Sequence, residues 1–460
     1  MKKKVLLLNP PARKGVIRDY YCSHLAKGNY LWLPQDLLVF SGMLQDDCDL
    51  SVIDAMVMPL SEDKTLEEIQ SFSPDIIICM VAAVNWRSDM RFLSKLSQKT
   101  SALIIVSGDY SRIYPRQVLT ENTCIDAIVL DFSHCGILSY VFNPHSDSIV
   151  NIMTRESMHE EIVAVNEACS YPPPRHDLFP IKRYHLPHIQ CHPFTTILTT
   201  FGCMHACSYC PYERIPFKLR TIESIEQELR SIKSMGIREL FFRDQCFGSH
   251  REQAYAVCRL FEEVSHPFSW SCEMRTDKAD ETLLKAMKKS GCHTIMFGVE
   301  SASENILRKH NKNISLQRTK EAFHLAKQLG IRTLAHVIVG MQGEDELSLQ
   351  RLIDFCIELD PNYVSFNIAN PAWDTSFRDA LEKNNKIFDP KIEVDHSIGQ
   401  PVWESSQLSA RQVWEFRNRA IRKFYLRPTF VIREFFGAKS HYRRKMMLKA
   451  GLEVLLNHSV

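Results

Sequence analysis

The chain has 460 residues, enough for two or three domains with separate hydrophobic cores. Hydrophobic residues make up 45%, charged residues 24%, and the formal net charge is +2, so composition alone indicates neither an acidic partner nor nucleic acid. No apolar run approaches the roughly 18 residues of a membrane span, and the apolar run after Lys4 is too short for a signal peptide. The cysteine count of 15 is odd and most cysteines stand alone in apolar runs, so we predict a reduced, cytoplasmic setting.

Residues 1–142 predict a Rossmann-like, doubly wound α/β domain. Short apolar, β-branched runs alternate with segments suited to covering helices, which is the pattern of parallel βαβ units. The expected strands are Lys4–Leu8, Leu50–Asp54, Asp75–Met80, Ala102–Ser107 and Ala127–Leu130. The expected helices are Gln35–Gln45, Thr65–Ser71, Arg87–Lys99 and Pro115–Thr120. This order predicts a parallel sheet of these five strands.

Residues 143–194 interrupt this rhythm. Prolines in "YPPPRHDLFP" and "HLPH" exclude long helices and central strands, so we predict a linker that packs on its neighbours. From residue 195 the alternation resumes, with a helix over 221–235 and strands in "TTILTT", "ELFFRD", "FSWSCEM", "HTIMFGVE", "RTLAHVIVG" and "NYVSFNI". These repeats predict a partial or full (β/α) barrel over 195–385, followed by a basic helical region over 386–460.

The most informative stretch is "FGCMHACSYCPY", residues 201–212. Its cysteines, Cys203, Cys207 and Cys210, directly follow the first strand of the expected barrel, where (β/α) barrels carry their chemistry. Three thiolates from one loop can bind three irons of a cubane cluster and leave the fourth iron open. A structural zinc or a closed cluster would need a fourth protein ligand, such as His205 or Cys191, and three unrelated buried cysteines are the remaining alternative.

The motif "CMHACSYC" resembles the C-x3-C-x-aromatic-C signature of the radical S-adenosylmethionine (SAM) enzymes, with Tyr209 at the aromatic position. The resemblance implies a [4Fe-4S] cluster on the three cysteines, with SAM chelating the open iron. It also implies an electron donor such as flavodoxin or ferredoxin. The SAM would then be cleaved to a 5′-deoxyadenosyl radical that abstracts hydrogen from a small-molecule substrate.

Two later segments strengthen the resemblance. "MFGVESAS", residues 296–303, is similar to the fourth-strand segment of the family and would bring Glu300 and Ser301 near SAM. "HVIVGMQGE", residues 336–344, is similar to the fifth-strand segment, where Gly340 and Gly343 would let the backbone approach the adenine. Read without the family, Glu300 is an acid at a helix start and the glycines are ordinary turn residues.

Two further residues are candidates for SAM contacts. "FRDQCF", residues 242–247, occupies the second-strand position where many family members contact the SAM amino group, and Asp244 or Gln245 would serve there. Arg275, in "CEMRTD", follows a strand end facing the same cavity and would bind SAM or substrate, or else form a surface ion pair.

The N-terminal domain resembles that of the cobalamin-binding subfamily of radical SAM enzymes. "LLLNPP", "LSVIDA", "PDIIICMVAA" and "ALIIVSG" follow the order of that subfamily. However, "SGDY" at 107–110 and "DFSH" at 131–134 stand where members often carry glycine-rich loops, which let the corrin and its nucleotide tail approach the backbone. Cobalamin bound at the strand ends and a vestigial domain without cobalamin are both open at this point.

The C-terminal segment is strongly basic. Residues 408–450 contain twelve Lys or Arg against two Glu, so an anionic partner is one prediction and a solvated helical face is the other. Phe424 and Phe430 indicate that these helices also pack on the barrel.

We therefore predict a radical SAM enzyme that modifies an unactivated carbon of a small metabolite or natural product, through cobalamin-assisted methyl transfer. The first alternative is a cobalamin-free rearrangement, dehydration, epimerisation or deoxygenation with a vestigial N-terminal domain. The second is a non-catalytic iron-sulfur protein. Asn367, Asn370 and Trp373 are candidates for the substrate lining.

Overall fold

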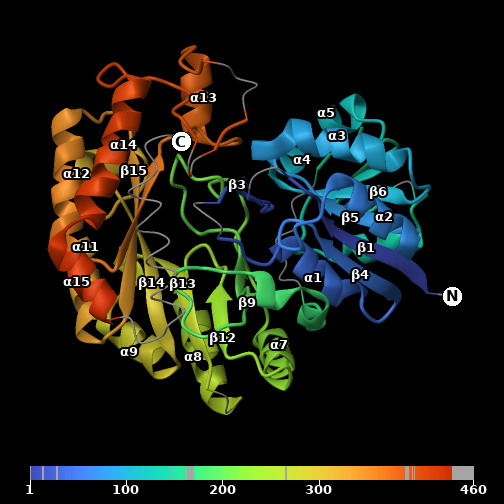
Figure 1. The fold of residues 1–460 in the computed structure, drawn as a ribbon, viewed down its shortest axis with the longest axis horizontal. Coiled ribbons are helices and arrows are strands. Elements are labelled where there is room, and N and C mark those ends of the chain that lie inside the picture. The colour runs from blue at the N-terminus through green and yellow to red at the C-terminus, as the bar shows by residue number, and fades with distance from the viewer. Residues whose placement is uncertain are drawn as a thin grey trace. The chain divides into compact units, whose positions relative to one another are not determined.

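The computed structural model describes residues 2–12, 15–26, 30–146, 148–159, 161–162, 170–264, 267–388, 393–395, 397 and 399–437. The chain forms two compact units (Figure 1). Unit 1 comprises Met1–His185 and Pro216–Ile237, and unit 2 comprises Leu186–Ile215 and Arg238–Val460.

Unit 1 is built on a six-stranded sheet in the order β4-β1-β5-β6-β7-β8. The strands are β1 Lys3–Asn9, β4 Cys48–Asp54, β5 Ile76–Met80, β6 Leu103–Ser107, β7 Ala127–Val129 and β8 Ile152–Thr154. The first five of these pair in parallel, which confirms the α/β class and the predicted strands. The prediction of only five strands is wrong, because the short β8 adds an antiparallel edge next to β7.

Helices cover both faces of this sheet. They are α1 Gln35–Leu44, α2 Glu62–Phe72, α3 Trp86–Ser97, α4 Asp109–Ile113, α5 Pro115–Glu121 and α6 Gly136–Phe142. Apolar residues of α2, α3 and α5 form one core cluster with the strands. Helix α1 packs against β1, β4 and β5 and also contacts α6, which packs against β8. A small antiparallel ribbon, β2 Val16–Ile17 and β3 His24–Leu25, follows β1. The four predicted helices are present, and α4 and α6 are additional.

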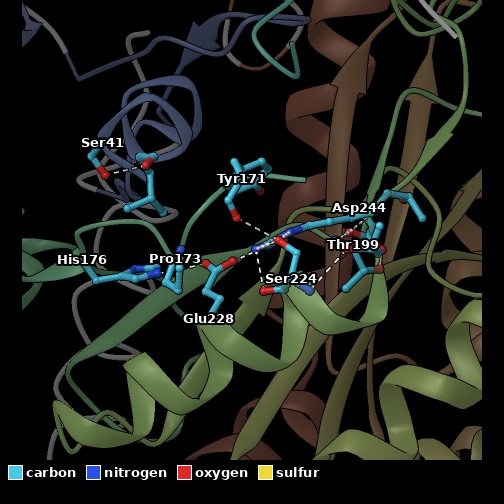
Figure 2. A network of polar contacts seen from close by, with 12 residues as sticks. Ser41, Tyr171, Pro173, His176, Thr199, Ser224, Glu228 and Asp244 are labelled. Atoms are coloured by element: carbon cyan, nitrogen blue, oxygen red, sulfur yellow. Dashed lines mark hydrogen bonds and ion pairs between the residues drawn. The ribbon is translucent and has the colours of Figure 1, made fainter. Parts of the chain in front are cut away.

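The predicted linker over 143–194 is divided between the units. Unit 1 also takes β11 Lys218–Leu219, α7 Ile222–Ser234 and the short helices η2 His176–Leu178 and η3 Ile181–Arg183. The reason is a buried polar network in which Glu228 accepts from His176 at 2.9 Å and forms an ion pair with Arg220 (Figure 2). Ser224 donates to the carbonyl of Tyr171 at 3.0 Å, and Arg220 stacks on the Tyr171 ring. These contacts attach residues 170–185 to α7 rather than leaving them as a connection.

Unit 2 carries a second six-stranded sheet, in the order β16-β15-β14-β13-β12-β9. Its strands are β9 Phe194–Ile197, β12 Glu239–Phe242, β13 Ser269–Arg275, β14 Cys292–Glu300, β15 Arg332–Val339 and β16 Tyr363–Ile368, and the short β10 Thr200–Phe201 follows β9. All neighbouring pairs are parallel. The order runs from β9 to β16 without returning to β9, so the predicted barrel is a partial one.

Helices connect these strands. They are α8 Arg251–Glu263, α9 Glu281–Lys289, α10 Glu304–Lys309, α11 Leu316–Gln328, α12 Glu346–Leu359 and α13 Ser376–Lys383, with η4 Thr276–Lys278 after β13. Several begin at a side chain that accepts from a first-turn amide, such as Asp280, Ser315 and Asp345. Along β15, Ala335, Val337 and Val339 are fully buried, whereas the alternate residues on the inner face are partly exposed. The inner face of the sheet is therefore the accessible one.

The C-terminal helices α14 Ala410–Tyr425 and α15 Pro428–Gly437 belong to unit 2. Phe424 is fully buried, and the Tyr425 hydroxyl donates to the carbonyl of Val364 on β16 at 2.7 Å, as predicted for packing on the barrel. Lys423 and Arg433 form ion pairs with acids of the same unit. Residues 438–460, which carry the rest of the basic segment, lie outside the described residues, so the anionic partner stays a prediction. Among the helices that the structure describes, none is both long enough and apolar enough to cross a membrane.

Candidate functional site

The cysteine loop follows β9 and β10 at the carboxyl end of the unit 2 sheet. Cys207 is buried, Cys203 and Cys210 are partly exposed, and none of the three is in a disulfide. The amide of Cys210 donates to the carbonyl of Cys207 at 2.9 Å, which curls the second half of the loop into a turn. Side chains of the three cysteines are thus held on one short segment.

The middle of the loop is tied to later parts of unit 2. Ser208 shares a hydrogen bond with Nδ1 of His310 at 2.9 Å, and its amide donates to the His310 carbonyl at 3.1 Å. The Ser208 carbonyl accepts from the amide of Phe377 at the start of α13. These bonds fix the loop between the segment after α10 and α13.

Asp244, just beyond β12, fixes the start of the loop (Figure 2). One carboxylate oxygen accepts from the amides of Thr199 and Thr200 at 2.6 and 3.3 Å, and the other accepts from the Thr199 hydroxyl. Burial raises the pKa of Asp244 to about 6. Both oxygens are therefore engaged within the chain, and the contact of Asp244 with the SAM amino group stays a prediction. Its neighbour Gln245 donates to the carbonyl of Arg243.

Arg275, the last residue of β13, reaches the cysteine loop. Its Nη1 donates to Sγ of Cys207 at 3.6 Å, while Asp277 pairs with its Nε at 3.0 Å. His205 lies opposite Ser249, with 3.3 Å between Nε2 and Oγ, and burial lowers the pKa of His205 to about 4. A guanidinium thus contacts one of the predicted ligands directly.

Glu300 stands at the end of β14 in a left-handed conformation, with φ of 63°. Its carboxylate forms a 2.6 Å ion pair with Nζ of Lys312, and both side chains are almost wholly buried. A Cβ at Gly298 would lie 2.6 Å from Oε1 of Glu300 and from Nζ of Lys312, so a larger residue there would displace the ends of both side chains. The contact of Glu300 with SAM stays a prediction.

Glu344 is a functional candidate that sequence reasoning missed. Fully buried, it accepts from the amides of Gly340 and Met341 at 2.7 and 2.9 Å, and from the Ser301 hydroxyl at 3.5 Å. Burial raises its pKa to about 8. The carboxyl links the predicted Ser301 to the turn after β15. Its signal was the acid that ends "GMQGE" in the fifth-strand segment.

The two glycines of that turn have different surroundings. Gly340 has φ of 88°, and a Cβ there would lie 2.7 Å from the Val413 side chain on α14. Gly343 has φ of 103°, and its nearest neighbour would be 3.8 Å away. Gly340 is therefore required for packing of α14, and a role for either glycine against adenine stays a prediction.

Tyr209 lies close to several of the other predicted site residues. Its phenol packs beside His310 and against a cluster that includes Met341 and Phe377. Burial raises the pKa of Tyr209 well above its usual value, and the nearby charges of Glu300, Cys207 and Cys210 raise it further. The second and third cysteines, the aromatic position and the fourth-strand acid thus form one electrostatic neighbourhood.

The three cysteines of the loop are candidate ligands of a cubane cluster. In the described part of the chain, no three His, Cys, Asp or Glu side chains could together hold one metal ion. A single zinc needs its ligands to converge on one point. A cubane cluster is bound by a different iron at each thiolate, so its cysteines need not converge in that way.

The inner face of the sheet next to this site is polar. Arg243, directly after β12, approaches Glu273 of β13 to 3.6 Å, and Arg332 stacks on Tyr363 where β15 and β16 begin. Of the predicted lining residues, Asn367 points to this partly exposed face. Asn370 instead bonds to the backbone of Asp395, Gln400 and Val402. The guanidinium of Arg378 stacks on Trp373, with its Cζ 3.4 Å from the ring centroid.

A family model described as the Radical SAM superfamily matches residues 197–356. The matched range starts at the end of β9, spans the cysteine loop and the strands through β15, and ends in α12. The chain carries a radical SAM domain.

Relatives extend the likeness beyond the radical SAM domain. A protein of Pyrococcus horikoshii named as an uncharacterized methyltransferase is 26% identical over 94% of this chain and 95% of its own length. The anaerobic magnesium-protoporphyrin IX monomethyl ester cyclase of Rubrivivax gelatinosus is 23% identical over 92% of this chain and 80% of its own. Among solved structures, the cobalamin-dependent SAM radical enzyme OxsB with aqua-cobalamin and SAM bound superposes with a TM-score of 0.71, at 15% identity, over 97% of this chain and 70% of that one. The fold of the whole chain is thus that of radical SAM enzymes with an N-terminal doubly wound domain.

Proposed function

We propose that the radical SAM domain holds a [4Fe-4S] cluster on Cys203, Cys207 and Cys210 and uses it to cleave SAM. The observation that carries the proposal is one loop with these three cysteines, none of them in a disulfide, at the strand ends that also present Arg275 and Glu300. When bound and reduced by an external donor, the cluster would supply the electron that splits the SAM sulfonium into methionine and a 5′-deoxyadenosyl radical, which would abstract hydrogen from an unactivated carbon of a small molecule.

The chain's own groups bind and orient. Asp244 and Ser208 hold the two halves of the cysteine loop in place through the bonds described above. Arg275 neutralises charge at the Cys207 sulfur, and the carboxyl of Glu344 fixes the turn after β15 through its amides. Such prior ordering lowers the entropic cost of bringing SAM and substrate together.

The inner face of the sheet is the proposed substrate surface. It carries charges of both signs, on Arg243 and Glu273, with polar side chains at Ser365 and Asn367. A small polar substrate with hydrogen-bonding groups fits this lining better than a purely apolar one, because unpaired polar groups are costly to bury.

The proposal is tested by anaerobic reconstitution of the full chain with iron and sulfide. We expect about four irons per chain, an EPR signal of a reduced cluster that changes on addition of SAM, and release of 5′-deoxyadenosine with dithionite. Alanine at Cys203, Cys207 or Cys210 should abolish both the cluster and the product. Serine at the exposed Cys135 of unit 1 is the matched control and should keep both.

Two results would contradict the proposal. Zinc in place of iron, or a cluster that also disappears in Cys191→Ser, would indicate a site with a fourth protein ligand. A cluster that forms normally but yields no 5′-deoxyadenosine with any reductant would support the non-catalytic iron-sulfur protein instead.

Cobalamin-assisted methyl transfer is the second candidate for the outcome of the reaction. It is supported by the relative named as a methyltransferase, which matches over nearly its whole length. Product analysis separates the two, because S-adenosylhomocysteine forms only when a second SAM donates its methyl group. A second relative that matches over most of its length is named as a cyclase, so the relatives' names do not agree on methyl transfer.

A further inference from the structure

The sheet order of unit 1 identifies where a ligand would bind in such a domain. Counting the parallel strands along the chain, the order is 2-1-3-4-5, with the switch point between β1 and β5. Doubly wound sheets bind ligands at the carboxyl ends of the strands beside that point. A corrin with a nucleotide tail would need free backbone amides and space at the ends of β1, β5, β6 and β7.

The end of β5 is occupied by an internal ion pair. Arg18, on β2's segment, binds Asp89 of α3 through two contacts of 3.1 and 2.6 Å, and both side chains are fully buried. The same guanidinium donates to Oδ1 of Asn9, at the end of β1, at 2.8 Å. Asp89 in turn accepts from the amide of Ala82 at 2.9 Å. The first two amides beyond the strand are therefore already bonded, since the amide of Val81 donates to the carbonyl of Ser107 at 2.9 Å.

A second carboxylate takes the next amides. Asp109, the first residue of α4, accepts from the amide of Ala83 at 2.8 Å and from both the amide and the hydroxyl of Ser23, at 2.9 and 2.6 Å. The Ser23 hydroxyl also accepts from the amide of Val84 at 3.3 Å. Asp89 and Asp109 thus already bind the amides of Ala82 and Ala83, which an anionic ligand at this edge would need.

Aromatic side chains fill the space by the end of β7. Tyr20 packs against Tyr21 and Phe132, with ring centroids 4.8 and 5.0 Å apart, and all three rings are buried. The Tyr20 hydroxyl donates to the carbonyl of Leu130. At the neighbouring loop, a Cβ on Gly108 would lie 2.0 Å from the Val81 carbonyl, so this glycine serves the packing of the chain on itself.

We propose that unit 1 does not bind cobalamin, because its own residues 15–26 occupy the place of the cofactor. Three groups of that segment, Arg18, Tyr20 and Ser23, close the ends of β5, β7 and β6. The corrin's nucleotide tail could enter only if the buried ion pair of Arg18 with Asp89 broke and the buried ring of Tyr20 moved out. The inference deepens the proposed function, since a chain without corrin uses the adenosyl radical on its substrate directly.

Cobalamin binding by the full-length holoprotein tests the inference. The chain is reconstituted anaerobically with iron, sulfide and excess hydroxocobalamin, then desalted, and cluster and corrin are quantified separately. We expect a loaded cluster with complete loss of corrin on desalting. One corrin per chain, with the absorption of a bound cobalamin, would overturn the inference. Loss of the cluster would count against the proposed function alone, because corrin binding is measured independently of it.

Hydrogen exchange supplies a second readout that does not need the cluster. The amides of Ala82, Ala83 and Val84 should exchange slowly, and hydroxocobalamin should leave their protection unchanged. A change in protection at these amides on adding the corrin would contradict the proposal. The double variant Ser23→Ala/Asp109→Asn should raise the exchange rate of these amides while the cluster is kept. That result would show that the two side chains protect the amides beyond the end of β5. Unchanged exchange in a folded double variant would also count against it.

Discussion

The guanidinium of Arg275 donates a hydrogen bond from Nη1 to Sγ of Cys207, over 3.6 Å. Asp277 holds the other side of the guanidinium at 3.0 Å from Nε, so Arg275 is fixed in direction. A cationic donor at a ligand sulfur stabilises the more negative, reduced form of an iron-sulfur cluster. Arg275 is therefore placed to set how readily the proposed cluster accepts its electron.

Replacing Arg275 by Met should lower the midpoint potential of the SAM-free cluster. A hydrogen bond to a charged group contributes about 1.5 kcal/mol, which corresponds to about 60 mV for a one-electron couple. An EPR-monitored redox titration measures the shift. Arg251→Met, which removes an exposed ion pair with Asp280, is the control and should leave the potential unchanged. Equal potentials for wild type and Arg275→Met would refute the role.

Gly340→Ala should destabilise the protein more than Gly343→Ala does. Both positions have positive φ, which costs a residue with a Cβ about 1–2 kcal/mol. Only at Gly340 would the new methyl group collide with Val413, adding about 1–3 kcal/mol of overpacking. Thermal unfolding of the two variants measures the difference. Val413→Ala should partly rescue Gly340→Ala, and the absence of rescue would show that the steric explanation is wrong.

Glu344 makes stability depend on pH. Its pKa is raised to about 8 by burial, so the folded state binds a proton that the unfolded state has already lost between about pH 4.5 and 8. The stabilisation that the protonated carboxyl provides is complete at low pH and is lost as pH rises through the folded pKa. The free energy of unfolding should fall by no more than about 1.4 kcal/mol per pH unit. Glu344→Gln keeps an acceptor for the two amides and removes the titration. The denaturation midpoint should therefore decrease less from pH 5.5 to pH 8 in the variant than in wild type. An equal decrease in both proteins would contradict this.

Much of the fold follows from local sequence patterns. The predicted strands of both sheets are found within a few residues of their expected ends, because buried parallel strands are continuous apolar runs bounded by turns. Strand β8 was missed because it has three residues and pairs at a sheet edge. The attachment of α7 to unit 1 depends on the contact of His176 with Glu228, 52 residues apart, which no local pattern encodes.

The candidate site was predictable in part for the same reason. Spacing indicated the three cysteines and the aromatic Tyr209, since they lie on one loop. The partners of the other candidates are distant in sequence, such as Lys312 for Glu300 and Thr199 for Asp244. The sequence also indicated an unusual loop after the fourth N-terminal strand. It did not indicate that Ser23, 86 residues earlier, bonds to Asp109 there.

Removing Lys312 should be more damaging than removing the whole ion pair that it forms. Lys312→Met leaves the Glu300 carboxylate buried without its 2.6 Å partner, and breaking a buried pair on one side typically costs about 3–5 kcal/mol. The double variant Lys312→Met/Glu300→Gln has no uncompensated charge and should recover most of that loss. A double-mutant cycle by denaturant unfolding of the apoprotein measures the coupling, with the exposed pair Lys285–Glu281 as a control that should show almost none. If the changes in free energy of unfolding at Lys312 and Glu300 are additive, the two charges do not stabilise each other. Glu300 would then be available to bind SAM without breaking a stabilising ion pair.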